Sequence, residues 1–191
     1  MGEFTMTIMR EPQPEKNRVA QIIEAARKDP KEFGELYLLY AQPVFRYLFS
    51  RIGNLSEAED ATAQTFLAAL ERFPHYKHDG YFASWLFSIA RNKSADHFRK
   101  QRNETSLDAA EYIGADPNML QKIIESDQVS RLSKLINALS EEEQELLRLR
   151  FVADLSFGEI GRLINQKEDT AKKSIYRLLA RLKAQVEDPH V

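Results

Sequence analysis

The sequence predicts an all-α protein of two small helical domains joined by an acidic linker. Helix-interrupting residues are few, with seven glycines and seven prolines in 191 residues. Apolar residues recur at i, i+3, i+4 and i+7, the spacing of one helix face, and no comparable stretch alternates with the period of a strand. The segments with helical spacing are Phe33 to Tyr40, Phe45 to Ile52, Phe66 to Phe73, Phe82 to Ile89, Leu132 to Leu139 and Ile175 to Val186.

Length and composition place the chain among ordinary folded proteins. Hydrophobic residues make up 43% and charged residues 29% of the sequence, a balance typical of globular domains. No run reaches the roughly 18 to 20 apolar residues of a membrane span, and the start lacks the apolar core of a secretory signal. Cysteine is absent, which excludes disulfides and thiolate metal ligands. We expect a cytoplasmic protein with no membrane span.

Residues 1–18 are predicted to form a flexible lead. They are polar, show little periodicity and contain Pro12 and Pro14, which disfavour regular structure. Residues 1–5 are interpreted as a cloning remnant, because they precede Met6, the expected natural start. The first domain is therefore expected at residues 19–102.

Ser-x-x-Glu pairs predict where three helices begin. In such a pair the serine hydroxyl and the glutamate carboxylate accept hydrogen bonds from amides that the first helical turn leaves unpaired. Each pair precedes or opens an apolar pattern. The pairs are Ser56 with Glu59, Ser140 with Glu143, and Ser156 with Glu159.

Residues 103–130 are the predicted linker. They contain Gly114 and the Asp116-Pro117 pair, which favour a break in regular structure. Residues 101–130 carry two basic and six acidic side chains. The second domain is then expected at residues 131–187.

The second domain has the pattern of a helix-turn-helix. A capped helix at 140–151 precedes a second at 156–164, a polar turn at 165–167 follows, and Asp169 is the expected cap of a third helix. One face of this third helix is apolar, so Thr170, Lys173, Tyr176 and Arg177 are expected to point outward, where a recognition helix meets DNA. The alternative is a helical hairpin with a solvated basic face.

The segment 82–102 is the other predicted nucleic-acid surface. Between Arg91 and Arg102 it carries five basic residues against Asp96, and Phe87 and Phe98 fall on the same side. Aromatic rings can stack on unpaired bases while cations hold phosphates. In the alternative interpretation, favoured for each ring taken singly, Phe87 and Phe98 pack against another helix.

Enzyme chemistry finds little support in the sequence. His75, His78 and Asp79 have a ligand-like spacing, but no other histidine lies nearby to complete a metal site. A phosphate-binding loop and a nucleophile elbow are both missing. We expect no catalytic residue, no metal and no cofactor.

Three stretches of the chain form a pattern that extends over most of its length. They are Ala58-Glu59-Asp60-Ala61 through Gln64 to Leu67, Phe82 through Asn92 with Asp96 and Arg99, and Leu139-Ser140 through Leu155 to Ile160 into Lys172 and Arg177. In this order, over roughly residues 29–186, the chain resembles the bacterial RNA polymerase sigma factors of the extracytoplasmic-function class, group IV of the sigma-70 family.

The resemblance implies that the first domain docks on the clamp of the largest subunit of the RNA polymerase core. The family has Gln where Ala63 stands and Glu where Gln64 stands, so one charged contact is weakened. The positions that match the family's docking helix are Glu59, Asp60, Gln64, Thr65 and Phe66.

The resemblance also implies contacts with both promoter elements. The loop 76–81 matches the segment that captures a flipped base of the minus-ten element, and the minus-ten set is Lys77, His78, Asp79, Gly80, Arg91, Asn92, Lys93, Arg99 and Arg102. The minus-thirty-five set is Thr170, Lys172, Lys173, Ser174, Tyr176 and Arg177. The family often has Gly, Val and Arg where Asp169, Ala171 and Ser174 stand, which suggests an unusual element. Further implied partners are the flap of the second largest polymerase subunit and an anti-sigma factor.

Two other classes of function are kept beside this interpretation. A free-standing dimeric helix-turn-helix regulator would bind a two-fold repeated site without polymerase. A structural helical adaptor would show no salt-dependent affinity for DNA.

Overall fold

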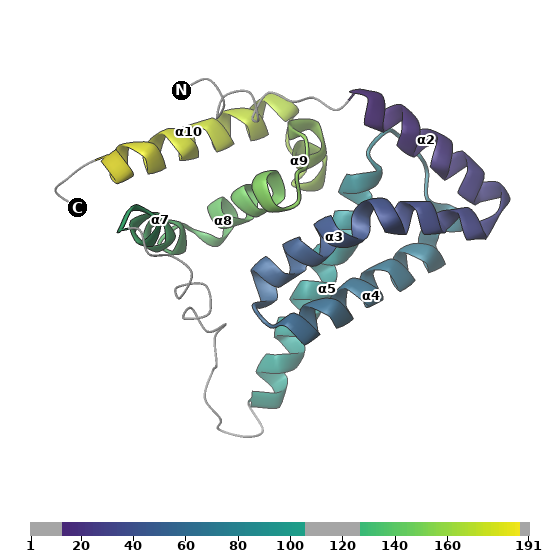
Figure 1. Cartoon of the computed structure of the whole chain (residues 1–191), viewed down its shortest axis with the longest axis horizontal. Coiled ribbons are helices and arrows are strands. Elements are labelled where there is room, and N and C mark those ends of the chain that lie inside the picture. The colour runs from purple at the N-terminus through teal and green to yellow at the C-terminus, as the bar shows by residue number, and fades with distance from the viewer. Residues whose placement is uncertain (1–12, 106–126, 188–191) are drawn as a thin grey trace.

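The computed structural model describes residues 13–105 and 127–187 of the chain. Within these two ranges every regular element is helical, which confirms the all-α prediction. The first range forms one group of helices and the second forms another, as Figure 1 shows. No helix in these ranges is long and apolar enough to cross a membrane.

The first domain is a bundle built on three long helices. The helices α3, α4 and α5 pack on one another, and α2 packs on α3. Their shared core includes Leu36, Leu48 and Leu86, all fully buried. The elements are α2 (Gln13–Lys28), η1 (Pro30–Glu32), α3 (Phe33–Ile52), α4 (Leu55–Arg72), η2 (Phe73–His75) and α5 (Phe82–Thr105).

The second domain is a set of shorter helices closed by α10. The apolar face of α10 buries Ala171, Ile175, Leu178 and Leu182 against α9 and neighbouring helices, as the sequence predicts. The elements are α7 (Asp127–Asn137), α8 (Glu141–Leu147), the π-helical turn η3 (Arg148–Val152), α9 (Phe157–Leu163) and α10 (Glu168–Glu187).

Two of the three predicted capping boxes are confirmed. Ser140 caps α8 and Ser156 caps α9, each with its glutamate bonded back to the cap N–H. The third prediction is wrong, because Ser56 lies inside α4. The cap of α4 is Asn54, whose side chain accepts the Glu57 N–H over 3.1 Å. An asparagine oxygen reaches the first-turn amides as a serine hydroxyl does, so the helix begins two residues earlier than the Ser-x-x-Glu pair predicts.

Three predicted boundaries also change. The flexible lead is wrong for residues 13–18, which belong to α2 with Pro14 in its first turn, where a missing N–H is tolerated. Residues 103–105 and 127–130, at the two ends of the predicted linker, are helical; the rest of the linker, and the supposed remnant at 1–5, lie outside the described residues. Asp169 lies in the first turn of α10 and does not cap it.

Candidate nucleic-acid and polymerase interfaces

The predicted polymerase-docking positions on α4 divide between the surface and the core. Glu59, Asp60 and Gln64 are exposed. Thr65 is fully buried and donates its hydroxyl to the Ala61 carbonyl over 2.7 Å. The Phe66 ring is also buried. These two side chains therefore pack inside the first domain and are not available to a partner.

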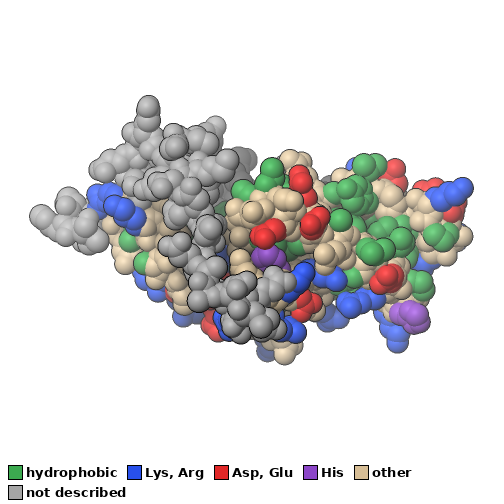
Figure 2. All heavy atoms as spheres, turned by 90° about the horizontal axis from the view of Figure 1, so that it is seen from below, with side chains coloured by type: hydrophobic (Ala, Val, Ile, Leu, Met, Phe, Trp, Pro, Cys, Tyr) green, Lys and Arg blue, Asp and Glu red, His purple; other side chains and the backbone are tan. Residues whose placement is uncertain are grey.

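Exposed apolar side chains lie on α4 and α3, and their exposure has no clear signal in the sequence. Leu67 is 59% exposed, and Tyr37 and Leu38 of α3 are exposed as well. The Tyr37 ring meets Phe66 edge-on, with centroids 4.8 Å apart. Figure 2 shows hydrophobic side chains gathered among charged ones on the first domain. Such a mixed surface suits contact with another protein.

The loop between η2 and α5 carries four of the predicted minus-ten residues. It is anchored by the buried Tyr76, whose ring packs 4.6 Å from that of Trp85 and 5.5 Å from that of Phe82. Burial, with the nearby carboxylate of Asp79, raises the pKa of Tyr76 to about 12. Gly80 turns the chain with φ +84, a conformation that L side chains rarely adopt. Of the predicted residues here, Lys77, Asp79 and Gly80 are exposed and His78 is half-buried.

The basic residues predicted on α5 remain on the surface. Arg91, Asn92, Arg99 and Arg102 are exposed and Lys93 is half-buried, while Arg99 donates to Asp96 over 2.9 Å. The favoured interpretation is confirmed for Phe87, which packs against another helix and is not free to stack on a base. Its ring is fully buried, edge-on to Tyr47 of α3 at 5.4 Å, because removing an aromatic ring from water is favourable.

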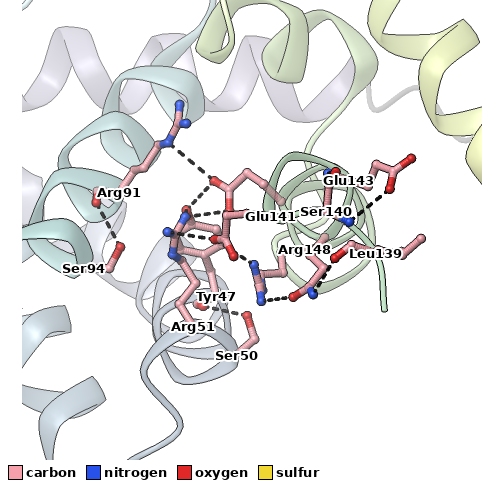
Figure 3. A network of polar contacts seen from close by, with 12 residues as sticks. Tyr47, Ser50, Arg51, Arg91, Ser94, Leu139, Ser140, Glu141, Glu143 and Arg148 are labelled. Carbon is pink, nitrogen blue, oxygen red and sulfur yellow. Dashed lines mark hydrogen bonds and ion pairs between the residues drawn. The ribbon is translucent and has the colours of Figure 1, made fainter. Parts of the chain in front are cut away.

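A buried carboxylate of the second domain joins the two domains. Glu145 of α8 is 5% exposed. It accepts the Tyr47 hydroxyl at 2.7 Å and an Arg51 N–H at 2.7 Å, both from α3. Arg91 of α5 lies 3.7 Å from the same carboxylate. Figure 3 shows Tyr47 and Arg51 of α3 and Arg91 of α5 on the side of the first domain that faces α8.

The electrostatics of this contact follow from its burial. A buried charge is tolerated when it is paired and hydrogen-bonded, and here the Glu145 carboxylate faces Arg51, which also pairs with Glu141 at 3.3 Å and donates to the Tyr47 hydroxyl at 3.2 Å. Burial and the negative charge of Glu145 raise the pKa of Tyr47 above its ordinary value. The phenol therefore stays protonated and donates.

A second contact joins the domains at the loop 76–81. Ser84 donates its hydroxyl to the Glu159 carbonyl of α9 over 2.8 Å. Arg162 of α9 pairs with Asp79, and its guanidinium lies 5.7 Å from the centre of the Tyr81 ring. Two predicted minus-ten residues, Asp79 and Arg91, thus already have partners in the second domain.

The helix-turn-helix is closed by a tight turn between α9 and α10. A Cβ at Gly161 would lie 2.8 Å from the Gln166 carbonyl oxygen, so the close approach requires glycine. Asn165 turns the chain with φ 56, in the region that asparagine tolerates better than most residues. The predicted turn at 165–167 therefore lies where the sequence placed it.

Four of the predicted minus-thirty-five residues of α10 lie on the surface, and two are partly covered. Thr170, Lys172, Lys173 and Arg177 are exposed, and Ser174 and Tyr176 are half-buried. The Tyr176 ring packs on Phe157 of α9 at 5.8 Å, so it braces the two helices. Ser174 and Arg177 also face Arg91 across a cleft of about 820 Å³.

Two of the residues with ligand-like spacing, His78 and Asp79, contact other side chains. His78 bonds through Nδ1 to the Tyr76 hydroxyl at 3.3 Å, and Asp79 pairs with Arg162. Among the described residues, no three His, Asp or Glu side chains gather closely enough to hold a metal ion.

Comparison with protein families places two matches along the chain. Residues 36–104 match sigma-70 region 2, and residues 130–182 match sigma-70 region 4. These spans agree with the two helical domains and together cover more than half of the chain.

Individual relatives agree with the family matches. The chain is 33% identical over 172 residues to the ECF RNA polymerase sigma factor BldN of Streptomyces coelicolor, covering 86% of this chain and 64% of BldN. It is 25% identical to the ECF sigma factor SigW of Bacillus subtilis, covering 91% of this chain and 97% of SigW. The sigma factor RpoE of Bartonella quintana, solved with the anti-sigma factor NepR, shares the fold with a TM-score of 0.61 at 20% identity, over 84% of this chain and 99% of RpoE.

Proposed function

This chain belongs to the sigma-70 family, in the extracytoplasmic-function class, and from that premise we propose that it binds the RNA polymerase core and directs it to promoters. The observation that carries the proposal is the order of the two matches, region 2 and then region 4. Each coincides with a folded domain that presents exposed cations. The protein would act by binding and by melting DNA, with no catalytic residue of its own.

In this proposal α10 reads the minus-thirty-five element. Its outer side presents Lys172, Lys173 and Arg177, and such side chains bind phosphates and base edges in the major groove. Ser174 stands where the family often has arginine. The loss of a bidentate donor there supports a recognition sequence that differs from the common one.

The loop 76–81 and α5 would receive the minus-ten element. The loop supplies a turn next to the aromatic cluster of Tyr76 and Trp85, and α5 supplies Arg91, Asn92 and the cations beyond them. A base removed from the duplex loses stacking energy, which a fitted pocket can offset.

The exposed part of α4 is the proposed polymerase-docking surface. It consists of Glu59, Asp60 and Gln64 with the neighbouring Leu67. The clamp of the largest subunit is the proposed partner of this surface, and the flap of the second largest subunit that of the second domain. An anti-sigma factor, as in the RpoE and NepR complex, is a further proposed partner, and the cytoplasm is the proposed location.

The test is binding of the labelled protein to bacterial RNA polymerase core, paired with run-off transcription on a promoter library at fixed salt. Tight core binding with promoter-dependent transcripts is the expected result. Glu59→Gln with Asp60→Asn should weaken core binding, while Glu32→Gln, an exposed carboxylate change on η1, serves as the control. Failure to bind core, beside binding of a two-fold repeated DNA site by the protein alone, would favour the dimeric regulator.

A further inference from the structure

A hydrogen bond within the first domain ties α2 to the loop 76–81. Arg27, near the end of α2, donates from Nη2 to the carbonyl oxygen of Tyr76 over 3.0 Å. The two residues are 49 positions apart in the chain. Arg27 also lies outside the region 2 match, which begins at residue 36, so the family comparison gives α2 no role.

The bond meets the loop where the chain leaves η2. The Tyr76 N–H is already used, since it donates to the Phe73 carbonyl over 3.0 Å, and the backbone becomes extended at this residue with φ −66 and ψ 122. The Tyr76 carbonyl is therefore the first peptide group that belongs to the loop itself. A charged donor makes a stronger bond to it than a neutral one would.

Arg27 is itself held in place. Its Nη1 donates to Glu24, one helical turn earlier, over 2.9 Å. The helix beneath is anchored by Ile23 and Ala26, which are buried in the core of the first domain. The guanidinium thus links a fixed helix to the start of the loop.

Asp79 of the loop makes one contact within the loop and one with the second domain. Asp79 accepts the Tyr81 N–H within the loop over 3.3 Å. The Asp79 carboxylate also pairs with Arg162 of α9, in the second domain. The Arg162 pair therefore depends on the position of the second domain, whereas the Arg27 bond lies wholly within the first domain.

We propose that Arg27 is a positioning residue for the loop 76–81, and that it holds the Tyr76 carbonyl so that the loop can capture an unpaired base of the minus-ten strand. This inference rests on the proposed function, which assigns base capture to the loop. It makes α2 part of the minus-ten surface, although no side chain of α2 needs to touch DNA.

The experiment uses the full chain bound to RNA polymerase core. The probe is a labelled single-stranded minus-ten oligonucleotide from a promoter selected by run-off transcription, and a series in which each position in turn is abasic. For the wild type, one abasic position should weaken binding most. We expect Arg27→Ala to reduce that penalty about three- to tenfold, the loss of part of one charge-assisted hydrogen bond.

Two further variants separate positioning from stability and charge. Arg27→Lys keeps a charged donor and should restore part of the base preference. Lys28→Ala removes the same charge from the next, exposed position and should leave the preference unchanged. Far-ultraviolet circular dichroism of each variant reports whether α2 remains folded.

The outcomes are distinct. Equal base preference in Arg27→Ala and wild type would overturn the role of Arg27 alone. An equal loss in Lys28→Ala would do the same, because charge and not the bond would then be responsible. A wild-type complex that binds core but shows no abasic penalty would overturn base capture by the loop, and this inference with it. A wild type that does not bind core would reject the proposed function at its first step.

Discussion

Tyr47 of α3 donates its hydroxyl to the Glu145 carboxylate of α8 over 2.7 Å, across 98 positions of sequence. Both side chains are buried, at 0% and 5% exposure. The bond therefore joins the two domains where water is excluded, and Arg51 supplies the charge that Glu145 requires.

Removing each partner of this contact should have different effects. Tyr47→Phe loses one hydrogen bond and should lower the free energy of unfolding by about 1 kcal/mol. Glu145→Ala leaves Arg51 without its buried partner and should lower it by about 3 to 5 kcal/mol. Urea unfolding measures both values, and energy transfer between labels on the two domains reports their separation. Glu142→Ala, at an exposed neighbouring position, is the control, and an equal effect there would contradict this assignment.

The buried tyrosines predict a stability that falls at alkaline pH. The pKa of Tyr47 is raised by burial and by Glu145, and that of Tyr76 is raised to about 12 by burial and Asp79. The folded state holds these protons more tightly than the unfolded state, so the stabilisation is present below about pH 10 and is lost as pH rises toward 12. Thermal unfolding at increasing pH, with tyrosinate absorbance, measures the effect. In Tyr47→Phe the decline should be shallower, and an unchanged slope would contradict this explanation.

The turn of the helix-turn-helix should not accept a side chain at Gly161. A Cβ there would meet the Gln166 carbonyl at 2.8 Å, so Gly161→Ala should destabilise the second domain by about 1 to 3 kcal/mol and weaken DNA binding. Gly34→Ala is the matched control, because its Cβ would meet nothing within 4 Å and alanine favours the helix by about 1 kcal/mol. Equal melting temperatures for the two variants would refute the close approach.

The start of α4 offers a test of which residue caps it. Asn54→Ala removes the acceptor for the Glu57 N–H and should lower the free energy of unfolding by about 1 kcal/mol. Ser56→Ala, inside the helix and exposed, should be neutral or slightly stabilising. Urea unfolding compares the two, and a larger loss for Ser56→Ala would restore the cap that the sequence suggested.

The outer side of α10 should carry the salt-dependent part of DNA binding. Lys173→Ala and Arg177→Ala should each weaken promoter-dependent transcription. Each should also reduce the slope of log affinity against log salt concentration by about one, since each cation releases one counterion from the DNA. Lys134→Ala on α7, also exposed, is the control. Unchanged transcription in both α10 variants would refute this recognition face.

Local sequence patterns were sufficient to predict the helical class, two helix caps and the apolar face of α10. The spacing of apolar residues predicts the helical class, since burial of one face requires that period, and the caps at Ser140 and Ser156 follow from bonds within four residues. The outward face of α10 follows in the same way. These features depend on contacts between residues that are close together in the sequence, so the sequence pattern alone predicts them.

What the sequence could not decide depends on residues that are distant along the chain. Phe87 could have faced bases or core, and Thr65 and Phe66 could have faced polymerase. Their burial is fixed by α3, which packs on both α4 and α5. The pairing of Tyr47 with Glu145 and of Arg27 with the Tyr76 carbonyl has no local signal at all. Such contacts arise only when helices pack, because a buried donor or charge must find whichever partner the packing brings near.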